Sequence, residues 1–184
     1  MFWRVMDLPE RLADDLHGTF PVLVDEYGGA VYTLALRLCG PDAADDIAQD
    51  TFVRAFAALG RYDAARIRGL ALRPWVVTIA LNVVRNRARH TARHPQVALA
   101  DGDVRVVPDP DLDMNRTDLR QVLASALLRL PAATREVVVL RHVLEFDTAE
   151  TATVLDRPVG TVKAQLARGL AALRKYLAGQ EDLR

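Results

Sequence analysis

The chain has 184 residues, of which 51% are hydrophobic, so it is long enough to bury one core or two small ones. Basic and acidic side chains number 24 each, and this zero net charge does not by itself indicate a nucleic-acid partner. The single cysteine, Cys39, excludes an internal disulfide and fits a reducing compartment, where we expect a small buried hydrophobe rather than a redox group. Because no alternating, strand-like run stands out, the composition favours an all-α protein.

Membrane and secretory segments are not expected. The longest apolar run, "PWVVTIALNVV", is interrupted by Thr78 and Asn82 and is too short to span a bilayer. The N-terminal "MFWRVMDLPERL" lacks the apolar centre of a signal peptide. The sequence therefore predicts a cytoplasmic protein without membrane insertion.

The neutral average conceals strong segregation of charge along the chain. Residues 1–60 have a net charge of −6, whereas residues 61–94 contain eight arginines and one acidic residue and have a net charge of +7. Residues 95–118 return to −4, and residues 119–184 come to +3. The second block is basic enough to bind phosphate groups.

Three long helices are predicted before residue 94. The first is "FPVLVDEYGGAVYTLALRLCG", ending at Gly40–Pro41. In the second, "DAADDIAQDTFVRAFAAL", Asp42 is the expected N-cap. Its apolar side consists of Ile47, Phe52, Phe56 and Leu59. The basic piece "GRYDAARIRGLALR" is interpreted as a loop, after which Pro74 is expected at the first position of "PWVVTIALNVVRNRARHTAR".

An acidic linker is predicted at residues 95–117, which contain three prolines and five aspartates without a helical period. Helices are expected near 118–129 and in "PAATREVVVLRHVLEF". The expected fold is thus all-α, with two small helical domains joined by a flexible acidic linker. The predicted domain boundaries are 16–94, 95–117 and 118–178.

A helix-turn-helix is predicted near the C-terminus. Asp147 and Glu150 form a capping box at the start of "DTAETATVL", and Pro158 is expected to open a second helix after a turn at Asp156 and Arg157. In that helix one stripe faces the core: Val159, Val162, Leu166, Leu170, Leu173 and Leu177. The opposite face combines small and basic side chains: Arg157, Gly160, Thr161, Ala164, Arg168, Ala171 and Lys175. Such a face suits close approach to a DNA groove, although an ordinary alanine-rich surface helix has the same pattern.

The helix after Pro74 has a face on which an aromatic ring accompanies amides and arginines. That face carries Trp75, Thr78, Asn82, Arg85, Asn86, Arg89 and Arg93. A ring that stacks on bases beside arginines that bind phosphates is typical of proteins that hold single-stranded or opened nucleic acid. The alternative is that Trp75 packs at a domain edge and the arginines are merely solvated.

The aspartate-rich helix indicates a protein partner rather than a metal site. Asp46, Gln49 and Asp50 share a face with Val53, but their spacing matches no calcium loop. The four histidines have no ligand spacing, and no nucleophile–base signature is present. We therefore expect no cofactor, no metal and no catalytic residue.

Taken together, these motifs resemble the sigma factors of bacterial RNA polymerase of the extracytoplasmic-function (ECF) class. "DAADDIAQDTFVRAF" and "PWVVTIALNVVRNRAR" are similar to region 2, and "LLRLPAATREVVVLRHV" with "AETATVLDRPVGTVKAQLARGLAALR" is similar to region 4. The resemblance covers about residues 20–94 and 119–177. It implies a promoter-specificity subunit that binds core polymerase, through the largest-subunit clamp and the flap, and promoter DNA. It also implies control by an anti-sigma factor.

The resemblance implies roles for matching residues. Core polymerase would contact Asp46, Gln49, Asp50 and Arg54. The opened −10 region would contact Arg61, Arg66, Arg68, Trp75, Asn82, Arg85 and Arg89. The −35 element would contact Arg157, Thr161, Lys163, Gln165 and Arg168.

Several residues depart from the usual pattern of this class. Glu145 stands where relatives usually have glycine, and Asp156 stands where they have a small turn residue. Thr151 replaces an aliphatic residue, and "GTVKAQL" lacks the hydroxyl and the charge of the usual "GTVKSRL". Three other hypotheses remain open from the sequence: a free-standing helix-turn-helix regulator, a nuclease using the aspartates, and an inactive partner-binding decoy.

Overall fold

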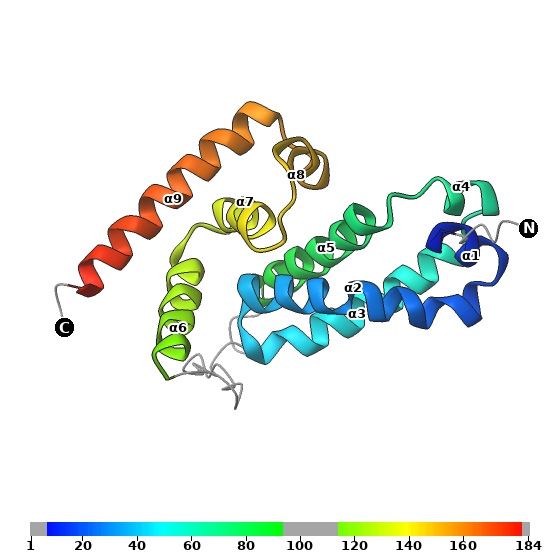
Figure 1. Ribbon diagram of the computed structural model, residues 1–184, viewed down its shortest axis with the longest axis horizontal. Helices are drawn as coiled ribbons and strands as arrows, with labels where there is room; N and C mark the ends of the chain where they lie inside the picture. Colours follow the sequence, from blue (N-terminus) through cyan, green and yellow to red (C-terminus); the bar gives the residue numbers. More distant parts are fainter. Residues whose placement is uncertain (1–6, 94–113, 182–184) are drawn as a thin grey trace, which may run out of the picture.

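The N-terminal half of the molecule is a bundle of helices. The computed structural model describes residues 7–93 and 114–181, and within these ranges every regular element is an α-helix (Figure 1). The N-terminal helices are α1 (Leu8–Asp14), α2 (Leu16–Cys39), α3 (Pro41–Leu59), α4 (Ala64–Arg68) and α5 (Leu72–Arg93). Helices α2, α3 and α5 pack against one another, and α1 lies against α4 and α2. The buried side of α5 is the predicted apolar one and includes Val76, Val77, Ala80 and Leu81.

Capping residues explain where α2 and α3 begin. The carboxylate of Asp15 accepts a hydrogen bond from the Gly18 amide at 2.9 Å, so α2 begins at Leu16, four residues before the expected start. Gly40, at φ 88°, separates α2 from α3. The prediction that Asp42 caps α3 was wrong, because Pro41 already occupies the first helical position, to which its fixed φ is suited.

Two predictions around residues 61–74 also need correction. The piece interpreted as a loop contains α4, whose N-terminus is capped by Asp63 accepting from the Arg66 amide at 2.7 Å. Helix α5 begins at Leu72 rather than at Pro74, and its first hydrogen bond runs from the Trp75 amide to the Ala71 carbonyl. Pro74 is tolerated in the first turn because an N–H there has no partner within the helix.

Four helices make up the described part of the C-terminal half, residues 114–181. They are α6 (Met114–Arg129), α7 (Ala132–His142), α8 (Thr148–Leu155) and α9 (Val159–Glu181). Helix α6 begins four residues before the predicted 118, so the last residues of the predicted linker are helical. The rest of that segment lies outside the described residues. Helix α9 packs on α7 through Gly169, where a β-carbon would lie 2.7 Å from Cγ2 of Val138.

The predicted stripe of α9 faces inward except at its first residue. Val162 is fully buried, and the four leucines further along the stripe are half-buried. Val159, in contrast, is 43% exposed. It is exposed because α9 begins at Val159 itself, one residue after Pro158, whose carbonyl accepts the first helical hydrogen bond from Val162.

The two halves are packed against each other. Helix α2 contacts α6 and α7, α5 contacts α8, and one connected cluster of buried apolar side chains runs through both halves. Helix α9 lies on the side away from the N-terminal bundle (Figure 1). The contact between the halves therefore places α5, the basic helix, next to α7 and α8.

Candidate functional site

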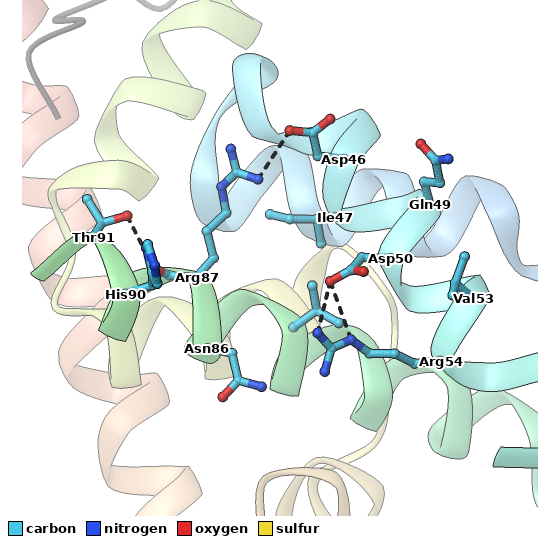
Figure 2. A pocket seen from close by; sticks show the side chains of 11 residues that line it. Asp46, Ile47, Gln49, Asp50, Val53, Arg54, Asn86, Arg87, His90 and Thr91 are labelled. Atoms are coloured by element: carbon cyan, nitrogen blue, oxygen red, sulfur yellow. Dashed lines mark hydrogen bonds and ion pairs between the residues drawn. The ribbon is translucent and has the colours of Figure 1, made fainter. Parts of the chain in front are cut away.

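A groove runs between α3 and α5 on the exposed side of the N-terminal bundle. Its volume is about 630 Å³, and all four residues of the predicted polymerase contact line it: Asp46, Gln49, Asp50 and Arg54 (Figure 2). The opposite wall comes from α5 and consists of Val83, Asn86, Arg87, His90 and Thr91. We refer to this surface as the α3–α5 groove.

Ion pairs order the walls of the α3–α5 groove. Arg87 reaches across from α5 to the Asp46 carboxylate at 3.2 Å, and Arg54 pairs with Asp50 one helical turn away at 3.1 Å (Figure 2). All four side chains are about half exposed or more, so each pair contributes at most ~1 kcal/mol. Val53 is 60% exposed beside them. A polar, charged wall with one exposed valine is suited to a protein partner.

An aromatic and basic cluster lies where α4 meets the start of α5. The rings of Tyr62 and Trp75 are 6.3 Å apart in an edge-on arrangement, and the Arg66 guanidinium lies 3.7 Å from the centre of the Tyr62 ring. Trp75 is half-buried against the apolar core. The packing of Trp75 agrees with the interpretation of a ring at a domain edge, whereas its contact with nucleic acid stays a prediction. Tyr62 was not predicted, although an aromatic residue inside the basic piece "GRYDAAR" was the available signal.

The other predicted residues of the basic surface lie in different surroundings. Arg61, Arg68, Asn82 and Arg89 are exposed. Arg68 forms an ion pair with Asp14 at 2.7 Å, and Arg89 donates to the side-chain oxygen of Asn86. Arg85 is the exception, because it turns toward the C-terminal half.

Arg85 binds a buried carboxylate, and its own side chain is 34% exposed. Its Nε and one terminal nitrogen donate to the two carboxylate oxygens of Glu136, in α7, at 2.8 and 3.0 Å. Glu136 is only 5% exposed. The hydrogen bond to Glu136 raises the pKa of Arg85 above its ordinary value, and burial only partly opposes this rise. The guanidinium is therefore held as a cation between the halves.

The helix-turn-helix is present, but α9 begins at Val159 and not at Pro158, so the prediction that Pro158 opens the second helix was wrong by one residue. The capping box of Asp147 and Glu150 is present at the start of α8, with hydrogen bonds of 2.8 and 2.7 Å. Asp156 turns the chain between α8 and α9 in a left-handed conformation, at φ 53°. Thr161, Lys163, Ala164 and Arg168 are exposed along the first turns of α9.

Gln165 and Arg157 are directed toward α7 rather than outward. Arg157 donates to Glu136 at 2.5 Å, to the Ala133 carbonyl at 2.8 Å and to the side-chain oxygen of Gln165 at 3.2 Å. The guanidinium of Arg157 thus lies between Glu136 and Gln165.

Sequence families match both halves of the chain. The family described as Sigma-70 region 2 matches residues 23–94, and the family described as Sigma-70, region 4 matches residues 120–173. The ECF RNA polymerase sigma factor SigW of Bacillus subtilis (strain 168) is 32% identical over 169 residues, which cover 86% of this chain and 88% of the relative. The chain belongs to the ECF class of sigma factors. It is an alternative sigma factor, which directs transcription initiation.

Further relatives agree with this assignment. The ECF RNA polymerase sigma-E factor of Escherichia coli (strain K12) is 27% identical over 177 residues, covering 90% of each chain. The solved structure of CnrH in complex with the cytosolic domain of CnrY matches this sigma factor with a TM-score of 0.69 and 28% identity, covering 94% of this chain and 96% of CnrH. The fold is shared as well with a sigma factor RpoE from Bartonella quintana, at a TM-score of 0.70 and 24% identity over 89% of this chain and 97% of that one.

The sequence analysis also missed Glu136, a buried acidic side chain of α7. It connects Arg85 of region 2 with Arg157 of region 4. The available signal was an acidic residue directly before the apolar run "VVVL". Within residues 7–93 and 114–181, no helix is both long and apolar enough to cross a membrane. The same ranges contain no group of three acidic, histidine or cysteine side chains suited to a metal ion.

Proposed function

We propose that this sigma factor binds core RNA polymerase through the α3–α5 groove. The observation that supports the proposal most directly is that Asp46, Gln49, Asp50 and Arg54 all line one groove, together with the exposed Val53. A helical element of the largest-subunit clamp that carries basic side chains would fit this acidic wall. The flap would bind region 4, as the family resemblance implies.

The −10 contact is proposed for the cluster of Tyr62, Arg66 and Trp75 and for the exposed arginines around it. The aromatic rings offer a stacking surface for an unpaired base, and Arg61, Arg68 and Arg89 are placed to bind phosphates. Asn82 is exposed on the same helix as Trp75 and offers an amide to a base edge. Arg85 belongs to this surface only when it is released from Glu136.

The −35 contact is proposed for the exposed first turns of α9. Thr161, Lys163 and Arg168 would face the DNA, and the small side chain of Ala164 between them allows close approach to the groove. Gln165 and Arg157 support this surface from behind through their contacts with each other and with α7. The left-handed turn at Asp156 fixes the angle between α8 and α9.

The remaining assignments follow from membership of the class. We propose a cytoplasmic location, no catalytic activity, an anti-sigma factor as regulatory partner, and domain boundaries near 94 and 114. The likeness to CnrH, whose solved structure holds the cytosolic domain of CnrY, supports a protein regulator. The free-standing regulator is not favoured, because residues 23–94 match sigma region 2.

Co-elution with core polymerase tests the proposed function. The purified sigma factor is expected to form a stoichiometric complex that supports run-off transcription. Asp50→Arg reverses a charge in the α3–α5 groove and should weaken the complex at least tenfold, whereas Asp45→Arg, an exposed site on the same helix outside the groove, should not. Equal affinities for the two variants would contradict the docking assignment.

A further inference from the structure

The α3–α5 groove holds a cation of its own opposite the wall that we assign to polymerase. Two carboxylates, Asp46 and Asp50, and two guanidinium groups, Arg54 and Arg87, line the groove, so these four charges cancel. Both carboxylates and Arg54 belong to α3, whereas Arg87 belongs to α5. The α3 wall is therefore acidic by itself, and Arg87 is the side chain that neutralises it.

The two ion pairs of the groove differ in where they lie. Arg54 and Asp50 are one turn apart on the same helix, so their pair stays on the α3 wall. The pair of Arg87 and Asp46 instead joins the two walls, with 3.2 Å between a terminal nitrogen and a carboxylate oxygen (Figure 2). A basic side chain that enters the groove toward Asp46 thus meets a guanidinium that is already bound there.

Arg87 can leave Asp46 at little cost to the fold. Its side chain is 47% exposed within the pair, and the side chain of Asp46 is 68% exposed. Water therefore solvates both groups before and after they separate, and no buried charge loses its partner. Exchange of Arg87 for another cation at Asp46 is consequently compatible with the folded protein.

We propose that Arg87 competes with a basic side chain of core polymerase for the Asp46 carboxylate and thereby lowers the affinity of this sigma factor for the polymerase. The proposal rests on the proposed docking of polymerase in the α3–α5 groove. Docking then exchanges an ion pair within the sigma factor for an ion pair between the two proteins. Without Arg87, the same intermolecular pair forms with no internal pair to break.

The test measures the affinity of Arg87→Gln for core polymerase, by fluorescence anisotropy of the labelled sigma factor. Binding should tighten roughly two- to fivefold, the range that an exposed ion pair provides. The affinity should also fall more steeply with added salt than in the wild type, because one more ion pair is gained on binding. Arg11→Gln, at an exposed position of α1 outside the groove, is the matched control for the loss of one positive charge and should have little effect on either property.

A double-mutant cycle with Asp46→Asn shows whether the gain depends on the carboxylate. In the Asp46→Asn background, Arg87→Gln should change the affinity no more than Arg11→Gln does, because no carboxylate is left to release. An equal gain in both backgrounds would reveal a general charge effect and overturn the competition. Weaker binding of Arg87→Gln would also overturn it, since Arg87 would then itself contact the polymerase.

The wild-type protein separates this inference from the proposed function. A wild-type complex with core polymerase, together with unchanged affinity in Arg87→Gln, overturns the competition and leaves the docking assignment intact. Absence of a wild-type complex would instead contradict the proposed function itself. Both substituted side chains of the cycle are exposed, so circular dichroism melts should show that each variant folds.

Discussion

Gly169 of α9 lies directly against Val138 of α7. A β-carbon on Gly169 would lie 2.7 Å from Cγ2 of Val138 and 2.8 Å from Cγ2 of Thr134, which is closer than such atoms approach in folded proteins. The glycine thus allows α9 to pack tightly on α7. At Gly160, near the start of the same helix, a β-carbon would have no other atom within 4 Å.

Gly169→Ala is therefore expected to destabilise region 4 by ~1–3 kcal/mol, because the added methyl group forces α7 and α9 apart. Gly160→Ala is the matched control and should leave stability unchanged or raise it by ~0.5–1 kcal/mol, since alanine favours helices. Urea denaturation followed by circular dichroism measures both. Equal effects at the two positions would show that the close approach is absent in solution.

Glu145 has a left-handed backbone conformation, at φ 55°, directly before Phe146 and the N-cap of α8. A side chain with a β-carbon is unfavourable there, so Glu145→Gly should raise the free energy of unfolding by about 1 kcal/mol. The same substitution at Asp156, at φ 53°, should raise the free energy of unfolding by less, because aspartate tolerates this conformation better than glutamate does. Thermal melts of the two variants check this order, and a larger gain at Asp156 would contradict it.

Lys163 is exposed on the first turns of α9, which we propose face the DNA. Lys163→Ala should lower the affinity of the holoenzyme for its promoter. If Lys163 contacts a phosphate, the slope of log affinity against log salt concentration should also fall in magnitude by about one. Lys175→Ala, about 18 Å further along the helix, should have little effect. Binding measured over a range of salt concentrations distinguishes the two. An unchanged affinity in Lys163→Ala would show that another face of α9 reads the DNA.

Burial raises the pKa of the Cys39 thiol above its ordinary value of 9.0, although nearby Arg135 and Arg87 lower it in part. The folded protein therefore holds this proton more tightly than the unfolded chain does. As the pH rises above 9.0, the unfolded thiol ionises first, so this residue's contribution to the free energy of unfolding falls. Iodoacetamide should accordingly modify folded protein more slowly than urea-unfolded protein at pH 9. Equal rates would show that the thiol is not shielded.

Local signals were sufficient for part of this structure. The capping box at Asp147 and Glu150 was predicted and is present, since two residues three positions apart determine it. Helix α4 was missed because a single turn capped by Asp63 has no periodic pattern to detect. Asp42 was assigned as a cap because its side chain suits the position, but the proline before it starts the helix sooner.

The surroundings of individual site residues depended on packing that no short motif encodes. Asp46, Gln49 and Asp50 were predicted on one face, and they line one groove. This could be predicted because the helical repeat alone places the three side chains on the same face of α3. Arg85 shared a predicted face with Trp75, yet it binds Glu136, a residue 51 positions away in sequence. Such a partner follows only from how the two halves meet. Whether the groove and α9 surfaces bind polymerase and DNA stays a prediction.

The double pairing of Glu136 constrains the order in which evolution can change these positions. An ancestor that loses one arginine keeps a partner for the buried carboxylate, so that step is tolerated. A lineage that loses the glutamate first leaves two guanidinium groups facing each other beside an apolar core, which is costly. Among descendants, arginines should therefore disappear from positions 85 or 157 before the acid disappears from position 136. The three positions should vary together rather than independently.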